Sequence, residues 1–269
     1  MKGKSLIFLL LLSAGIKAEG AGPSDRASQI RSRLLDPSDP CVLVIAHRAD
    51  WRNAPENSIA AIESAVQMGV DVVEIDVRKT LNGEFILNHA PVLFRPKDAP
   101  TLEEALLAAK GKVLVNLDKS FGYFDEVMEI AERTGTVEQI IIKSSRAAHD
   151  VEKVLGKYKG RVIFMPIINL NRGGALAKLE EYVQKLDPPM YELTFRSDSN
   201  PVITLAVARL SGRSRLWFDT LWPSLCGGHD DEASRADTAA GYGWLIDNLG
   251  AGAIQTDDPA FLMEYLKSR

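Results

Sequence analysis

The chain has 269 residues, of which 46% are hydrophobic and 25% are charged, a balance typical of a soluble globular protein. Its formal net charge of −4 at pH 7 gives no basic footprint of the kind that binds nucleic acid. Beyond the N-terminal segment no apolar run is long enough to span a bilayer, so we expect neither nucleic-acid binding nor stable membrane insertion.

The first residues have the features of a secretory signal peptide. Lys2 and Lys4 precede an apolar core at 6–16, which is too short for a transmembrane helix. Small residues follow at Ala18 and Gly20, where cleavage is expected. The sequence therefore predicts that residues 1–20 are removed and that the protein is secreted or periplasmic.

Residues 21–40 are expected to be an N-terminal extension of a single main domain at 41–269. The extension begins rich in Gly, Pro and Ser and continues as a short amphipathic helix with Ile30, Leu34 and Leu35 on its apolar side. A run of Asp and Pro at its end breaks the chain before the first strand. We expect the helix to be a lid over the bottom of the domain.

The stretch 42–89 predicts a strand, a helix and a second strand. The first strand is apolar and occupies 42–46. A turn at 55–58 opens the helix, and Gly69 ends it. The second strand follows at 72–77, and the chain then makes a short excursion before the next helix.

Ionisable residues gather where these two strands end. His47 and Arg48 follow the first strand directly, Glu74 and Asp76 lie on the second, and His89 follows the excursion. Parallel strands with both faces covered are nearly unbroken runs of Val and Ile, so charges inside them are costly. Their presence here indicates a functional site.

Glu74 and Asp76 are two positions apart, so on a strand their side chains project from the same face. Two close buried carboxylates repel each other unless one is protonated or a cation lies between them. A hard divalent metal ion is one solution, because Mg and Ca ions prefer carboxylate oxygens. The alternative is a pair of acids in salt bridges with Arg48, Arg78 or Lys79.

The rest of the chain continues the alternation of helices and strands. The expected order is a helix that starts at Thr101 with a capping box, strand 113–117, helix 123–134, strand 139–142, helix 146–158, strand 162–168, helix 174–186, strand 191–193, helix 201–211, strand 216–218, a polar excursion at 222–239, helix 240–249, strand 253–255 and helix 259–267. Eight strand–helix units without a linker or a repeat predict an α/β fold, a single (β/α)8 TIM barrel.

In such a barrel, function lies at the carboxyl ends of the strands. The first three strands are neighbours there, and His89 is expected at the same face. Together they bring seven polar residues to one mouth: His47, Arg48, Glu74, Asp76, His89, Asp118 and Lys119.

These residues resemble the signature of the glycerophosphodiester phosphodiesterase family, which runs His-Arg-Gly, Pro-Glu-Asn-Thr/Ser, Glu-x-Asp-Val and His-Asp. The chain has His-Arg-Ala at 47–49, Pro-Glu-Asn-Ser at 55–58, Glu-Ile-Asp-Val at 74–77 and His-Ala at 89–90. The resemblance extends through Asp118 and Trp217 to Ile-Gln-Thr-Asp-Asp-Pro at 254–259, so it covers nearly the whole mature chain.

The resemblance implies a TIM-barrel enzyme that hydrolyses glycerophosphodiesters or related small-molecule phosphodiesters to an alcohol and a phosphomonoester. It implies one divalent metal ion, Ca or Mg, held by Glu74, Asp76 and Asp118. The family's two catalytic histidines correspond to His47 and His89, which would act as general base and general acid. The arginine that contacts the phosphate corresponds to Arg48.

Three departures from the signature leave a second hypothesis open. Ala49 replaces a Gly, Ala90 replaces an Asp, and Asp118 stands where the family usually has a Glu. The two alanines suggest a non-catalytic relative that binds phosphorylated ligands on the same scaffold. Because both histidines and all three acids are retained, the sequence favours the enzyme.

Other candidates for substrate binding follow later strands. Lys119 and Lys143 could hold a phosphate or a carboxylate, or could be solvated strand-end lysines. Glu192 could bind the alcohol part of the substrate or form a buried ion pair. Trp217 could pack on the substrate or fill the core. The acidic loop at 227–232 could bind a metal ion or be a surface turn.

Overall fold

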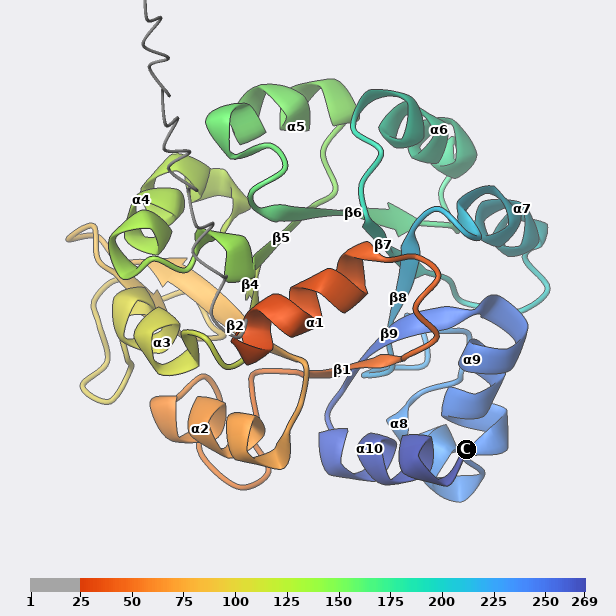
Figure 1. Ribbon diagram of the computed structural model, residues 1–269, viewed down its shortest axis with the longest axis horizontal. Coiled ribbons are helices and arrows are strands. Elements are labelled where there is room, and N and C mark those ends of the chain that lie inside the picture. Colours follow the sequence, from red (N-terminus) through yellow and green to blue (C-terminus); the bar gives the residue numbers. More distant parts are fainter. Residues whose placement is uncertain (1–24) are drawn as a thin grey trace, which may run out of the picture.

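Eight parallel strands form a closed barrel in the computed structural model, which describes residues 25–269 (Figure 1). Neighbouring strands follow each other around the barrel, and the last one pairs back to the first. The strands are β1 (Leu43–Ala46), β2 (Val72–Lys79), β4 (Leu114–Asp118), β5 (Ile140–Ser144), β6 (Ile163–Asn169), β7 (Met190–Thr194), β8 (Arg215–Asp219) and β9 (Ala251–Thr256). The predicted (β/α)8 barrel is confirmed. The expected signal peptide lies outside the described residues.

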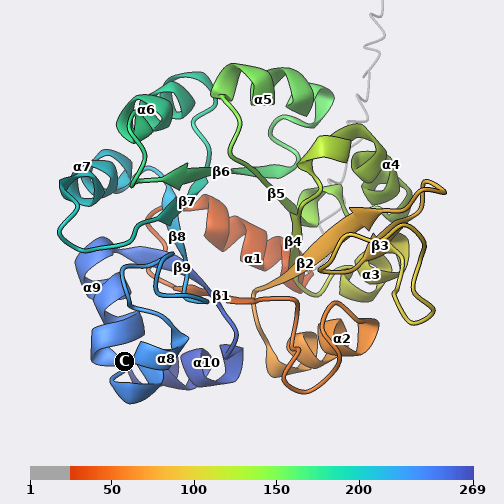
Figure 2. The ribbon, with the colours of Figure 1, turned by 180° about the vertical axis from the view of Figure 1, so that it is seen from behind.

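A short hairpin extends β2 beyond the barrel. Strand β3 (Phe85–Leu87) pairs antiparallel with the end of β2, so that Val77 lies opposite Leu87. This hairpin is the excursion that the sequence indicated after the second strand. It projects from the barrel wall beside β2 in Figure 2, which shows the barrel from the side opposite to Figure 1.

Helices surround the barrel on its outside (Figures 1 and 2). They are α2 (Ile59–Met68), α3 (Leu102–Ala109), α4 (Phe124–Thr134), α5 (Ala148–Leu155), α6 (Ala175–Lys185), α7 (Pro201–Leu210), α8 (Asp231–Ala236), α9 (Trp244–Leu249) and α10 (Pro259–Ser268). Among residues 25–269, the structure contains no helix with the length and apolar character needed to cross a membrane.

Local sequence explains where these helices begin and end. The Ser58 side chain accepts a hydrogen bond from the backbone N–H of Ala61 at the start of α2, and Gly69 ends the helix in the left-handed region with φ of 93°. The capping box predicted at the start of α3 is present, with Thr101 and Glu104 each satisfying a backbone N–H of the other.

Two elements near the C-terminus differ from the sequence prediction. The helix expected at 240–249 is a π-helical turn, Ala239–Gly243, followed by α9, and the backbone at Gly241 leaves helical geometry. A Cβ atom at Gly241 would lie 2.0 Å from Ser234 Oγ, so this close packing requires glycine. The polar excursion at 222–239 contains the short helix α8, which the sequence prediction missed.

The N-terminal helix α1 (Arg26–Leu35) covers the bottom of the barrel, as predicted (Figure 1). Ile30 and Leu34 are buried in one apolar cluster with residues that point into the barrel, among them Leu43, Met190 and Trp217. Leu35, expected on the same side, is 43% exposed, so the apolar side of the helix is narrower than predicted.

Candidate active site

Three carboxylates meet at the barrel mouth, at the carboxyl ends of β2 and β4. Asp76 and Asp118 are register partners across the two strands, and Glu74 lies one layer deeper, opposite Asn116. Glu74, Asp76 and Asp118 each offer one carboxylate oxygen, and these three atoms lie within 4.8 Å of one another. The structure thus brings together the three acids that the sequence proposed as metal ligands.

Two lysines lie against this acid cluster. Lys119 Nζ contacts a carboxylate oxygen of Asp76 and lies 3.0 Å from Asp118 Oδ2. Lys143 Nζ lies 3.8 Å from Asp118 Oδ1 and 3.1 Å from Glu192 Oε2. Burial opposes the charged form of Asp118, but both lysines outweigh it and lower the pKa of that carboxyl.

Glu74 is the carboxyl group that lies deepest in the barrel mouth. Burial raises the pKa of Glu74 to about 7, and the charges of Asp76 and Asp118 add to this effect against the opposing charge of His47. A divalent cation at the cluster would favour the ionised carboxylate instead of a proton. The donor set consists of hard carboxylate oxygens, which fits the Ca or Mg ion implied by the resemblance.

Asn57 holds Asp76 in position. Its side-chain Nδ2 donates to Asp76 Oδ2 at 2.9 Å, and its Oδ1 accepts from the backbone N–H of Asp76 at 2.8 Å. Asn57 is 3% exposed, so this paired contact is shielded from water. The Asn of the Pro-Glu-Asn-Ser turn therefore fixes one of the acids.

His47 leaves β1 directly beside the acid cluster. Its Nδ1 lies 2.7 Å from Asp257 Oδ1, and its Nε2 lies 3.9 Å from Glu74 Oε2. Burial would lower the pKa of His47, but the hydrogen bond to Asp257 and the charges of Glu74 and Asp257 raise it above its ordinary value. With Nδ1–H donating to Asp257, Nε2 is the nitrogen that faces the cluster.

Arg48 is also held at the cluster. Its backbone N–H donates to Glu74 Oε2 at 2.9 Å, and its guanidinium Nη1 donates to Glu56 Oε2 at 2.6 Å. The guanidinium Nε lies 3.6 Å from Asp76 Oδ2. The side chain predicted to contact phosphate is therefore oriented by two acids at the edge of the mouth.

Backbone strain is concentrated at this site. Five non-glycine residues among 25–269 have positive φ, and four of them lie at the cluster: Arg48 (51°), Ala49 (62°), Asn57 (56°) and Lys119 (60°). The left-handed region costs a residue with a Cβ atom about 1–2 kcal/mol. Glycine at position 49, as in the family signature, adopts it freely. Such strain is typical of functional sites.

His89 and Trp217 have different surroundings from those of His47. His89 follows β3 and is exposed; Arg78 donates to its backbone carbonyl at 2.6 Å, but its ring has no hydrogen bond or ion pair with any of residues 25–269. Trp217 is fully buried in the barrel interior, and its Nε1 donates to Asp219 Oδ1 at 2.7 Å. Its position matches the core-filling alternative rather than a contact with substrate.

The acidic loop at 227–232 has structural contacts. The His229 ring stacks on Trp244 with ring centres 3.8 Å apart, and Asp230 caps α8. Asp231 accepts hydrogen bonds from Thr220 and from the backbone N–H of Asp257. The only group of acids that could hold a metal ion among the described residues is the one at Glu74.

Sequence reasoning missed the residue that orients His47. Asp257 follows β9 and also accepts a hydrogen bond from Trp51 Nε1 at 2.8 Å. Trp222 meets the His47 ring edge-on, with ring centres 6.3 Å apart. The Thr-Asp-Asp-Pro stretch around Asp257 was noted as part of the resemblance, but nothing in its spacing shows that the Asp257 side chain reaches the His47 ring.

The fold and the site define a (β/α)8 barrel with an acidic, histidine-flanked centre at its mouth. Residues 47–106 match the sequence model of the Glycerophosphoryl diester phosphodiesterase family, and residues 164–266 match a family described as a domain of unknown function. Over residues 47–106 the chain is thus similar to the glycerophosphodiester phosphodiesterases, as its sequence motifs indicated.

Curated relatives match parts of the chain. A glycerophosphodiester phosphodiesterase of Caldanaerobacter subterraneus is 49% identical over 47 residues, 18% of this chain and 19% of that protein. One from Bacillus subtilis is 32% identical over 95 residues, 35% of this chain and 31% of that protein. The chain thus spans less than a third of the length of these relatives.

Solved structures match over most of the chain. A glycerophosphoryl diester phosphodiesterase from Parabacteroides distasonis has a TM-score of 0.66 at 19% identity and covers 90% of this chain and 92% of its own. An Oleispira antarctica phosphodiesterase in complex with the product sn-glycerol-3-phosphate has a TM-score of 0.59 at 15% identity and covers 86% of this chain and 99% of its own. At these identities the likeness establishes the fold.

Proposed function

We propose that the chain is a metal-dependent phosphodiesterase that hydrolyses glycerophosphodiesters or related small-molecule phosphodiesters to an alcohol and a phosphomonoester. The observation that carries the proposal is the acid cluster of Glu74, Asp76 and Asp118 beside His47, whose ring is fixed by Asp257. The product complex of the structurally similar Oleispira antarctica phosphodiesterase supports the same reaction.

The three acids would hold one Ca or Mg ion, which when bound neutralises charge on the phosphate oxygens. His47 Nε2 faces the cluster while Nδ1 is anchored, so this nitrogen can take a proton from the attacking hydroxyl or give one to the leaving alcohol. His89, on the hairpin loop, would perform the other proton transfer. Arg48 would contact the phosphate from the edge of the cluster.

A second candidate function is binding of phosphorylated ligands without turnover. Two observations favour it: Ala90 stands where the family has an Asp, and the ring of the neighbouring His89 has no hydrogen bond or ion pair within the described part of the chain. A ring without a partner is not held for proton transfer in the ligand-free protein. If the chain is an enzyme, the histidine variants should lose turnover. If it only binds phosphorylated ligands, the wild type should show no turnover and the variants only modest changes in affinity.

Turnover of a panel of phosphodiesters, measured with and without EDTA, tests the proposal. We expect hydrolysis that EDTA abolishes and that depends on pH with a bell-shaped profile. His47→Ala and His89→Ala should each cost about 10²–10⁴ in rate, the usual worth of a positioned proton donor or acceptor. His149→Ala, which removes an exposed histidine on α5, is the control.

Two results would contradict the proposed metal-dependent, two-histidine mechanism. Turnover that persists in a metal-free preparation would exclude metal dependence. Single variants that keep more than about half of the wild-type rate would exclude the two-histidine mechanism. A wild type that binds phosphodiesters but turns none over would be the binding protein.

We also propose that the protein is exported after loss of residues 1–20. The support is the charged start and short apolar core of that segment. N-terminal sequencing of the protein recovered from its native compartment should give a start near residue 21. An intact Met1 on the accumulated protein would contradict export.

A further inference from the structure

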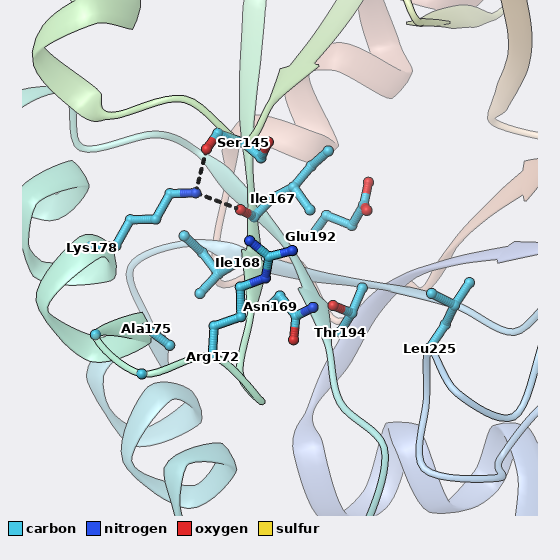
Figure 3. A pocket seen from close by; sticks show the side chains of 12 residues that line it. Ser145, Ile167, Ile168, Asn169, Arg172, Ala175, Lys178, Glu192, Thr194 and Leu225 are labelled. Atoms are coloured by element: carbon cyan, nitrogen blue, oxygen red, sulfur yellow. Dashed lines mark hydrogen bonds between the residues drawn. The ribbon is translucent and has the colours of Figure 1, made fainter.

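A cavity opens on the mouth side of the barrel, across from His47. Its volume is about 530 Å³, within the range of small-molecule sites. It is lined by the carboxyl ends of three consecutive strands, β5, β6 and β7, and by the loop that leads into α6. Figure 3 shows this cavity with its side chains.

Two cations line the cavity without a carboxylate partner. Lys178 Nζ donates to the backbone carbonyls of Ser145, at 2.6 Å, and Ile167, at 3.3 Å (Figure 3). The Arg172 guanidinium points toward the middle of the cavity between Ile168 and Asn169 (Figure 3). Among residues 25–269 neither side chain forms an ion pair or hydrogen bond with an acid.

The two positive charges repel each other. Burial, and then the nearby charge of Arg172, lower the pKa of Lys178, while Glu181 opposes the shift only in part. The acid that lines the cavity, Glu192, is already paired with Lys143. An anion in the cavity would relieve the repulsion between Arg172 and Lys178.

The backbone beside these cations is open to a ligand. Helix α6 begins after Gly173 and Gly174 and has no side-chain cap, so N–H groups of its first turn have no side-chain partner. A Cβ atom built at either glycine would meet nothing within 4 Å. A bulky oxyanion can therefore approach both the guanidinium and the start of the helix.

The cavity adjoins the acid cluster. Glu192 lines the cavity and bonds to Lys143, whose Nζ lies 3.8 Å from Asp118. A phosphodiester held at the cluster can thus extend one of its two arms past Lys143 into the cavity. The cavity would offer that arm two apolar side chains, Ile167 and Leu225, as well as the two cations.

We propose that the leaving alcohol of the substrate carries a second anionic group, a phosphate or a carboxylate, which Arg172 and Lys178 bind in this cavity. The inference rests on the proposed phosphodiesterase function and defines its substrate class. Hydrolysis breaks the bond between phosphorus and the oxygen of this arm and adds the hydroxyl of water to phosphorus. The alcohol takes the proton and leaves with its anionic group intact.

Three matched substrates test the inference. They are glycerophosphoglycerol, the same molecule with a phosphate on the terminal hydroxyl of the leaving glycerol, and the analogue with a carboxylate at that carbon. Turnover is followed by phosphorus NMR for the wild type, Arg172→Gln and Lys178→Met. Lys185→Met, at the exposed far end of α6, is the matched control.

The wild type should prefer at least one anionic substrate over the neutral one by about tenfold or more in kcat/KM, the usual effect of a charge-assisted hydrogen bond. Arg172→Gln and Lys178→Met should each reduce this preference about tenfold while changing kcat/KM for glycerophosphoglycerol by no more than about threefold. Lys185→Met should change neither value. Equal turnover of all three substrates, or equal losses on all three, would overturn the inference.

Calorimetric titration of the same substrates in EDTA separates this inference from the proposed function. Binding of the anionic arm should persist without metal, be about tenfold tighter than that of the neutral substrate, and weaken in Arg172→Gln. If no substrate is turned over, the proposed function fails, and the titration still decides whether the cavity binds anions. Equal affinity for neutral and anionic substrates would exclude anion binding in the cavity.

Discussion

The buried carboxyl group of Glu74 makes the stability of the metal-free protein depend on pH. Its pKa of about 7 lies above the 4.5 of a free Glu, so between these pH values the folded chain holds a proton that the unfolded chain has lost. The metal-free protein should therefore lose stability as the pH rises from about 4.5 to 7. Stability falls with rising pH because the pKa of Glu74 is higher in the folded chain than in the unfolded chain.

Glu74→Gln should remove this effect. In EDTA at about pH 8 the variant should be more stable than the wild type by up to about 3 kcal/mol, and the difference should vanish near pH 4.5. Urea unfolding at a series of pH values measures the difference. A difference that is the same at all pH values would contradict the raised pKa of Glu74. Full activity of the variant with metal would contradict the role of Glu74 as a metal ligand.

Asp257 should act on the reaction through His47. Asp257→Asn keeps the shape of the side chain but removes the charge that raises the pKa of His47. The limb of the pH–rate profile that reports His47 should therefore move to lower pH, and kcat should fall by about 10². Asp247→Asn, which removes an exposed acid paired with Arg269, is the control and should change neither. An unshifted profile would show that Asp257 has only a structural role.

At the scale of elements, helix α1 offers a matched pair of leucines. Leu34 is fully buried under the barrel, and its neighbour Leu35 is 43% exposed. Leu34→Ala should lower the free energy of unfolding by about 2–5 kcal/mol, whereas Leu35→Ala should change it by about 0.5 kcal/mol or less. Both variants should keep the wild-type kcat, because α1 lies at the end of the barrel opposite the acid cluster. Urea unfolding and turnover assays check the two expectations.

Elements with a strong local signal could be predicted from the sequence. The Val- and Ile-rich strands, the capping box at Thr101 and the glycine end of α2 all depend on neighbouring residues. Helix α8 has only six residues, too few for a period to be recognised, and the π-helical turn depends on packing of Gly241 against Ser234. Long-range packing decided these elements, so local patterns could not show them.

In the candidate site, too, the sequence predicted some contacts but not those that depend on long-range packing. The spacing of Glu74 and Asp76 showed that two acids share a face, and the barrel topology placed Asp118 beside them. The predicted barrel places the last strand beside the first, but the contact of Asp257 with His47, 210 positions apart, also depends on how the loop after β9 packs, which no local pattern shows. The cations Arg172 and Lys178 belong to a cavity formed by the ends of three strands and the loop before α6, which no single motif encodes.

At the scale of the whole molecule, the metal should stabilise the fold. An ion that binds only the folded state at 100 times its Kd adds about 2.7 kcal/mol. For a domain of this size such a gain corresponds to a rise in Tm of about 5–10 °C. Thermal unfolding of the wild type with Ca, with Mg and with EDTA measures it. Glu74→Gln should lose most of the rise; an equal rise in the variant would place the ion elsewhere.

The helix beneath the barrel has a consequence for the order of folding. The apolar side of α1 is buried with Trp217 of β8 and Ala253 of β9, and the Arg215 guanidinium bonds to the carbonyl of Arg33, 182 positions earlier. A ribosome makes α1 near the start of synthesis, but the surface that buries it exists only after the last strands have emerged. Ile30 and Leu34 must stay exposed until then, so folding intermediates of this chain should be prone to associate, and the barrel is sealed late in folding.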